Sequence, residues 1–334
     1  MRITREVLLK NTRDIISQRT RADRSLLSVY LCGSMLEEEY LLGGAADIDL
    51  VFIHTDLVPS PREVIGLTDE IHLDIAHHNH RDYRQPRNLR VHPWLGPTMK
   101  DCKVMYDPQH FLDFTQASVR GQFERSDHVM ERSRLQADHA RQIWLEFHTT
   151  HPQSGPKEVA KYLRAVEHAA NAVASLSGPP LTERRFLTRF AERAAALGRP
   201  GLHAGLIGLL GGANTEGQDS REWISAWRAA YDAVPVDLRP VRLHQSRRLY
   251  YQNAFHSLSE SGQPLSVLWP LLYSWTQSAL LLPEDDPALQ LWNDTLTRLG
   301  LLGAGFDERV AALDAYLDMV EETLDQWARD NGAE

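Results

Sequence analysis

Cysteine is scarce in this chain, and positive charge is not in excess. Of the 334 residues only Cys32 and Cys102 are cysteines, and they lie too far apart to suggest a metal-binding pair. This pattern excludes a disulfide-rich secreted fold and favours reduced thiols in a cytoplasmic protein. Lys and Arg number 36 against 45 Asp and Glu, which gives a net charge of −9. The balance argues against a protein that coats nucleic acid through charge, so no bulk nucleic-acid binding is expected.

The chain also lacks a hydrophobic run of membrane-spanning character. Residues 261–283 carry no charge and are rich in Leu and Trp, but Pro270 and several Ser and Thr side chains interrupt them. Glu284 follows without a basic flank, so we predict a buried core helix here and expect no membrane partner. The first residues are charged and contain no apolar stretch of signal-peptide type, which again predicts a cytoplasmic location.

Internal repeats and low-complexity segments are absent, and the periodicity of apolar residues changes once along the chain, near residue 118. Before that point, patterns typical of strands occur at residues 25–31, 47–54, 70–77 and 103–106, and helices are predicted at residues 1–25, 35–42 and 61–68. Helical periodicity follows. The sequence therefore predicts an α/β domain with a mixed sheet over residues 1–118, then an all-α domain over residues 119–334.

The helical domain is predicted from apolar residues that recur every three or four positions. Val159, Leu163 and Val166 share one face of a helix, whereas Lys161 lies elsewhere on it. Further helices are predicted at residues 183–197, 221–233, 243–259, 265–282, 287–299 and 308–329.

Two carboxylates alternate within the apolar strand at residues 47–54. Asp47 and Asp49 point to one face of that strand, while Ile48 and Leu50 point to the other. Asp74 repeats the arrangement on a later strand. If the two strands are neighbours, three carboxylates meet on one face, and such a cluster is costly without cations. Hard oxygen ligands of this kind suit Mg²⁺, and two such ions can clamp a phosphoryl transfer.

A glycine–serine turn precedes the carboxylates and is suited to bind phosphate. Gly33 allows the backbone to turn tightly and phosphate to approach closely. Ser34 would begin the following helix, where free N–H groups attract anions.

These residues together resemble the nucleotidyltransferase superfamily that includes DNA polymerase β. The resemblance consists of Leu31 and Gly33-Ser34, a spacer of twelve residues, Asp47-Ile48-Asp49-Leu50, and the later Leu73-Asp74-Ile75. It covers roughly residues 25–110, including the short strand at residues 103–106 that often closes the minimal bacterial form. The helices that follow are similar only in general type to the helical domains of antibiotic nucleotidyltransferases, and this similarity implies that residues 119–334 complete an acceptor site or bind a partner.

The resemblance implies a mechanism and its residues. Asp47 and Asp49 would bind the Mg²⁺ that accompanies a nucleoside triphosphate, with ATP expected, and Asp74 would join a second metal or act as general base. Gly33 and Ser34 would cradle the phosphates, and Lys161 of the helical domain would meet the triphosphate. Attack at the α-phosphate would transfer a nucleoside monophosphate to a hydroxyl acceptor on a small molecule, a protein or an RNA end, and release pyrophosphate.

Several features leave other interpretations open. Glu37 lies close to the phosphate turn where many relatives carry Arg, and Ala46 stands where Ser or Thr often precedes the first Asp. A non-catalytic nucleotide sensor or antitoxin-like partner on the same fold is therefore the alternative function, and a purely structural scaffold is a third. Ser34 and Glu37 also have the spacing of a helix capping box, in which Ser34 would only stabilise a helix.

A basic stretch follows Asp74 and has two interpretations. His77, His78 and His80 begin it, and arginines continue it to His92. It could form a surface for phosphate or an acidic acceptor, but a solvated loop is the preferred prediction. Hard carboxylates suit Mg²⁺ better than these imidazoles do, so the histidines are not assigned to the metal.

Overall fold

The computed structural model describes residues 4–56, 60–215 and 220–333. The chain divides into two compact units, Met1–Glu124 and Arg125–Glu334. An α/β region and a helical region are both present, as predicted, and the division lies six residues beyond the expected 118/119 boundary. The difference arises because a helix at Phe111–Arg120 belongs to the first unit.

A mixed sheet of five strands forms the centre of the first unit. The strands are β1 (Leu26–Cys32), β2 (Ala46–His54), β3 (Arg62–Gly66), β4 (Ile71–Asn79) and β5 (Lys103–Tyr106), in the spatial order β3-β4-β2-β1-β5. β2 and β4 are parallel, and the other neighbours are antiparallel. β1, β2, β4 and β5 lie where the sequence predicts strands, to within two residues at each end, so four of the five strands were predicted.

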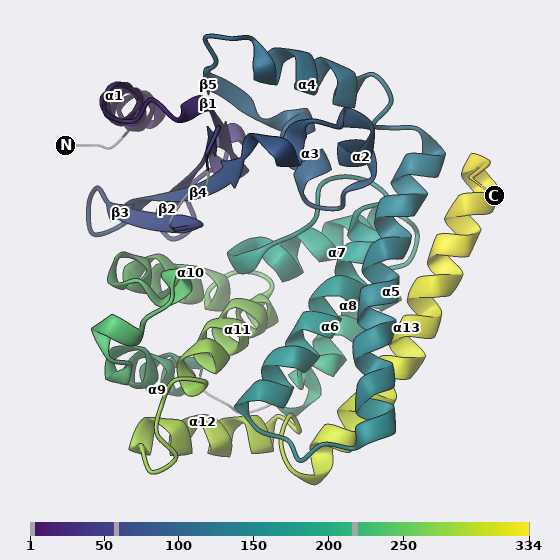
Figure 1. Ribbon diagram of the computed structural model, residues 1–334. Coiled ribbons are helices and arrows are strands. Elements are labelled where there is room, and N and C mark those ends of the chain that lie inside the picture. The colour runs from purple at the N-terminus through teal and green to yellow at the C-terminus, as the bar shows by residue number, and fades with distance from the viewer. Residues whose placement is uncertain (1–3, 57–59, 216–219, 334) are drawn as a thin grey trace. The chain divides into compact units, whose positions relative to one another are not determined.

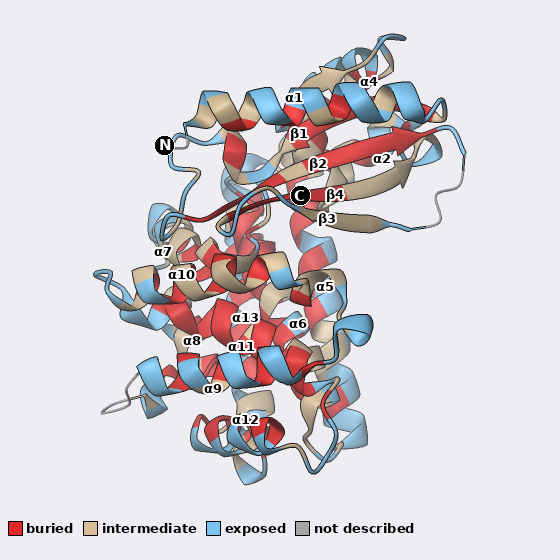
Figure 2. Ribbon diagram, turned by 90° about the vertical axis from the view of Figure 1, so that its left-hand side faces the viewer, coloured by how far each residue is buried: buried red, intermediate tan, exposed pale blue. Residues whose placement is uncertain are grey.

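Helices cover both faces of this sheet (Figure 1). On one face α1 (Arg5–Ala22) buries Leu8 and Ile16 against a core that includes Ile48 and Leu50 of β2. The other face packs against α2 (Pro86–Val91), α3 (Leu95–Asp101) and α4 (Phe111–Arg120). Val51 takes part in this second core, so successive residues of β2 serve opposite cores, and every residue of the strand except the partly exposed Asp49 is buried (Figure 2).

Two predicted helices in this unit are wrong. The predicted helix at residues 35–42 is only a 3-10 turn, η1 (Gly33–Leu36), because Glu37 already has an extended backbone. The segment at residues 61–68 contains the strand β3, which pairs with the edge of β4. The order of polar Arg62 and Glu63 and apolar Val64 and Ile65 has no clear helical or strand period. The segment is a strand because it pairs with the edge of β4.

Nine α-helices are described in the second unit. They are α5 (Ser126–Thr150), α6 (Pro156–Ala174), α7 (Phe186–Ala196), α8 (Gly201–Leu209), α9 (Ser220–Ala233), α10 (Arg248–Ser259), α11 (Leu268–Ala279), α12 (Pro287–Arg298) and α13 (Ala304–Asn331). The long helices α5, α6 and α13 pack against one another (Figure 1). α8 lies in a glycine-containing segment where no helix was predicted.

The uncharged segment near residue 270 confirms the prediction of a core helix. Most of α11 is buried, including Trp269 and Trp275, and the helix is only 12 residues long. Throughout the described ranges, no helix combines the length and hydropathy needed to cross a membrane.

Candidate metal site

The parallel pairing of β2 with β4 places the predicted acidic residues on one face of the sheet. In register, Asp47 lies opposite His72 and Asp49 lies opposite Asp74. Because cross-strand partners and alternate residues share a face, these four side chains all extend from the same face. Val51 continues this face of β2 and is covered by the second core. On this face of β2 the polar residues thus occupy the start of the strand, and Val51 and Ile53 follow them in the second core.

Three of these side chains converge closely enough to hold a metal ion. Ligand atoms of Asp47, His72 and Asp74 all lie within 4.8 Å of one another. The three residues are 7%, 0% and 2% exposed, respectively. Two carboxylates at this separation repel each other when both are ionised, and a cation relieves that repulsion. Among the described residues this is the one group of His, Cys, Asp and Glu with such geometry.

Asp74 is also held by an arginine from the edge strand. Arg62 Nε donates to Asp74 Oδ1 at 2.5 Å, and a terminal guanidinium nitrogen donates to Oδ2 at 2.9 Å. The Asp74 side chain is 1% exposed and that of Arg62 is 38% exposed, so the guanidinium connects a buried carboxylate to the surface. Such a bidentate pair fixes the plane of the carboxylate. A carboxylate oxygen can accept more than one interaction, so the bonds from Arg62 do not by themselves prevent Asp74 from binding a metal ion.

The glycine–serine turn lies directly against Asp49. Gly33 has a φ of +70°, in the left-handed region that favours glycine. A Cβ placed on Gly33 would lie 2.0 Å from Asp49 Oδ2 and 2.8 Å from Asp49 Cγ. Both the backbone angle and the close approach of Asp49 therefore require glycine at this position. Burial, and then the charge of Asp49, raise the pKa of the neighbouring Cys32 thiol well above its ordinary value.

Ser34 does not form the capping box that its spacing with Glu37 suggests. The Glu37 amide donates to the backbone oxygen of Ser34 at 2.9 Å, and no side-chain cap is present at η1. Ser34 Oγ is shielded from solvent and has no hydrogen-bond partner in the described part of the chain. The capping interpretation is therefore wrong, and the hydroxyl remains able to bind a ligand.

Lys161 lies on α6, in the helical unit. Its ammonium forms an ion pair with Glu146 of α5 and lies 5.7 Å from the centroid of the Phe147 ring. These contacts account for the side chain as part of the packing of two helices. A contact between Lys161 and a triphosphate stays a prediction.

The basic stretch after Asp74 is not the loop that was preferred. It contains the end of β4, the 3-10 turn η2 (His80–Tyr83) and α2. His77 is hydrogen-bonded to His54 and Glu63, and His78 is bonded to Tyr83. These histidines belong to internal hydrogen-bond networks and lie outside the metal group.

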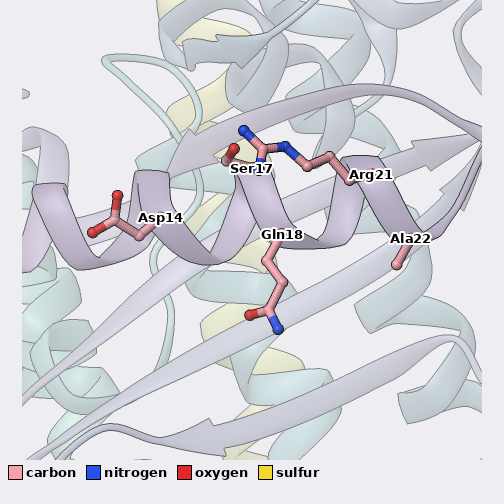
Figure 3. A pocket seen from close by; sticks show the side chains of 5 residues that line it. All are labelled: Asp14, Ser17, Gln18, Arg21 and Ala22. Carbon is pink, nitrogen blue, oxygen red and sulfur yellow. The ribbon is translucent and has the colours of Figure 1, made fainter.

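A hollow on the first unit lies away from these residues. Figure 3 shows the side chains that line it, all from α1. They are Asp14, Ser17, Gln18, Arg21 and Ala22. The hollow follows the outer side of a helix whose inner side packs on the opposite face of the sheet, so it is not part of the acidic site.

The sequence interpretation missed two residues of this site. His72 precedes Asp74 by two positions in a strand, and this spacing could have placed it on the same face. Arg62 was missed because its segment was predicted to be helical, and nothing in the sequence indicated that β3 would lie beside β4.

Comparison with known proteins does not assign the chain to a family. No known protein family matches the chain, and no curated protein matches it either. The resemblance to nucleotidyltransferases therefore rests on the glycine–serine turn and the spaced carboxylates.

Proposed function

We propose that this chain is a metal-dependent nucleotidyltransferase. It would transfer a nucleoside monophosphate from a nucleoside triphosphate, ATP foremost, to a hydroxyl acceptor and release pyrophosphate. The observation that carries the proposal is the contact of the Gly33 turn with Asp49, which lies beside Asp74 in the parallel register. The turn, which is suited to bind phosphate, thus lies next to the carboxylates, which are suited to bind a cation.

The residues present fit a divalent cation. Asp47, Asp49 and Asp74 offer hard carboxylate oxygens from one face, and the 4.8 Å spread within the Asp47–His72–Asp74 group suits a single ion. These residues would hold Mg²⁺ or a pair of divalent ions. When bound, such an ion offsets the charge of the triphosphate and of the departing pyrophosphate.

The chain's own residues supply the other roles. Gly33 allows Asp49 to approach the turn closely, because a Cβ there would lie 2.0 Å from Asp49 Oδ2, and Ser34 Oγ is a shielded donor without an internal partner among the described residues. Asp49 packs against the turn, so its carboxylate would orient a phosphate group or a cation bound beside it. Asp74 accepts two hydrogen bonds from Arg62, so it is better suited to bind a cation than to take a proton from the acceptor hydroxyl.

The Arg62–Asp74 pair also favours a second candidate, a nucleotide sensor that does not transfer. The Arg62 guanidinium already neutralises part of the charge on Asp74. A protein that only binds nucleotide does not need to displace this guanidinium. The sensor and the enzyme make the same prediction for nucleotide binding and opposite predictions for pyrophosphate release.

A pyrophosphate-release assay separates the two. The full-length protein is incubated with Mg²⁺, each of the four ribonucleoside triphosphates, and acceptors of three classes: polyhydroxylated small molecules, proteins and RNA 3′ ends. We expect release with at least one acceptor class, and about a 100-fold or greater loss in Asp49→Asn. Asp14→Asn, on the exposed side of α1, is the matched control and should retain activity.

The outcome that rejects the enzyme is equally clear. If the wild-type protein shows a thermal shift with ATP and Mg²⁺ but releases no pyrophosphate with any acceptor class, the sensor is supported. If neither binding nor release occurs, both nucleotide functions are rejected.

A further inference from the structure

We propose that the Asp47–His72–Asp74 group selects a transition-metal ion such as Mn²⁺ over Mg²⁺, and that His72 is the ligand responsible. The inference rests on the proposed function only in that it specifies the ion of the same site. It concerns His72, to which the motif of spaced carboxylates assigns no role.

The position of His72 makes it a ligand candidate. It is fully buried and lies opposite Asp47 in the parallel register, two residues before Asp74 on the same strand. On its other side its strand partner is Gly66, which has no side chain to contact the ring. The imidazole is therefore bordered by two carboxylates, and one of its nitrogens lies within 4.8 Å of an oxygen of each.

The chemistry of this donor set distinguishes between ions. Mg²⁺ prefers six oxygen ligands in octahedral geometry and gives up its waters reluctantly. An imidazole nitrogen suits transition-metal ions, whose affinities for a mixed nitrogen and oxygen site rise from Mn²⁺ to Cu²⁺ and fall again at Zn²⁺. A group of two carboxylates and one imidazole thus gains more from Mn²⁺ than from Mg²⁺.

Arg62 strengthens this selectivity. Its guanidinium lies on both oxygens of Asp74, so any cation at the group must share that carboxylate with a positive charge. An ion held by oxygen atoms alone feels this repulsion without compensation. An ion that also gains a bond to His72 nitrogen is compensated, so the pair of Arg62 and His72 disfavours Mg²⁺ in particular.

The competing account is that His72 is a structural hydrogen-bonding residue between Asp47 and Asp74. In that case removal of the imidazole changes the stability of the fold, but it leaves the ratio of Mn²⁺ to Mg²⁺ affinity as it was. The ratio is therefore the quantity to measure.

The test uses the full-length protein without nucleotide or acceptor. Binding of Mn²⁺ is followed by the electron paramagnetic resonance signal of the free ion, and Mg²⁺ affinity is obtained by competition. We expect Mn²⁺ to bind about 100-fold more tightly than Mg²⁺ in the wild-type protein. His72→Gln should lose about tenfold or more in Mn²⁺ affinity while Mg²⁺ affinity changes by less than about threefold.

His256→Gln, an exposed position on α10, is the matched control and should leave both affinities unchanged. Equal affinity of the wild-type protein for the two ions overturns the inference, and so does an unchanged ratio in His72→Gln. Circular dichroism establishes whether His72→Gln is folded.

A second measurement needs no variant at this position. Cobalt(II) bound to the wild-type protein should give a strongly shifted, exchangeable imidazole N–H proton resonance, as a directly ligated histidine does. A cobalt-loaded protein without such a resonance has no histidine ligand, which overturns the inference even if His72→Gln fails to fold.

The two proposals can fail separately. If the wild-type protein releases pyrophosphate but binds Mn²⁺ and Mg²⁺ equally, the role of His72 is rejected and nucleotidyl transfer is still supported. Selective Mn²⁺ binding without release in any assay rejects the enzyme and leaves the metal site.

Discussion

The polar residues at the two ends of strands β2 and β4 are arranged in different ways, as a linear chain at one end and as a convergent group at the other. At the carboxyl ends, on the face covered by α1, a chain of hydrogen bonds runs from residue to residue. Ser25 Oγ is 3.1 Å from His54 Nδ1, His54 Nε2 is 2.9 Å from His77 Nδ1, and His77 Nε2 is 3.2 Å from Glu63 Oε1. At the start of the strands, on the other face, Asp47, His72 and Asp74 gather around one point.

This difference separates a structural network from a binding site. In the linear chain each imidazole can accept at one nitrogen and donate from the other, so neutral rings are satisfied by protein alone. Two ionised carboxylates have no hydrogen to share, so a convergent group needs a donor or a cation between them. The comparison predicts that metal ions will change the properties of the acidic end and leave the histidine chain unaffected.

The largest expected effect comes from the turn at the acidic end. Gly33→Ala adds a Cβ 2.0 Å from Asp49 Oδ2 at a residue with a φ of +70°, so the backbone and Asp49 must both move. We expect a loss of about 3 kcal/mol in the free energy of unfolding, from strain and displacement together. Urea denaturation measures this loss, and the thermal shift with ATP and Mg²⁺ should disappear.

Gly44→Ala is the matched control. Gly44 has a φ of +80°, but nothing lies within 4 Å of its added Cβ. It should cost only about 1 kcal/mol, from the backbone angle. If the two substitutions cost the same, Asp49 is not pressed against the turn, and the link between the phosphate turn and the carboxylates is lost.

Much of this fold follows from local sequence patterns. The alternation of Ile71, Leu73 and Ile75 with polar residues predicts a half-buried strand; β4 is a strand there, but its first five residues are buried on both faces. β3 could not be predicted in the same way, because it is held by the free edge of β4 rather than by a pattern of its own. Tertiary pairing of this kind overrides weak local preference.

The candidate site depends on the register between β2 and β4, which cannot be predicted from the sequence. The spacing of Asp47 and Asp49 shows that they share a face, but not that Asp47 lies opposite His72. A shift by two residues would keep every apolar residue in its core and would pair Asp47 with Asp74 instead. The carboxylates could be predicted from their motif, and His72 could be placed on the face of Asp74 by its spacing, whereas its position opposite Asp47 and the contact of Arg62 with Asp74 depend on the pairing of the strands.

A smaller effect is expected from the arginine at the acidic end. Arg62→Ala leaves the buried carboxylate of Asp74 without its bidentate partner. The loss in the free energy of unfolding should be about 2 kcal/mol in EDTA, below the range for fully buried pairs because Arg62 is partly exposed. Saturating Mn²⁺ should reduce this loss, since the ion replaces the guanidinium as the counter-charge.

Arg19→Ala tests the other end of the strands. Arg19 pairs with Glu63 at 3.1 Å, and both side chains are partly exposed, so its removal should cost less than about 1 kcal/mol. Mn²⁺ should not change that cost. An equal response of the two variants to Mn²⁺ would contradict the distinction between the convergent and the linear group.

The smallest effect is a pH dependence that originates in the histidine chain. Burial lowers the pKa of His54, and the charge of His77 adds to this, while Asp23 opposes it. The unfolded chain therefore binds more protons than the folded one just below the ordinary histidine pKa of about 6.5. Stability should be complete above that value and should decline as the pH falls, by at most about 1.4 kcal/mol per pH unit for one such group.

His54→Gln removes this contribution, because the amide can still bond to Ser25 and His77 but does not titrate. Melting temperatures measured from pH 7 to pH 5 should fall less steeply in His54→Gln than in the wild-type protein, whereas the exposed His256→Gln should keep the wild-type slope. The same comparison in Mn²⁺ and in EDTA should give the same difference in slope. A slope difference that depends on Mn²⁺ would mean that the two ends of the strands are coupled, and that the histidine chain is part of the site.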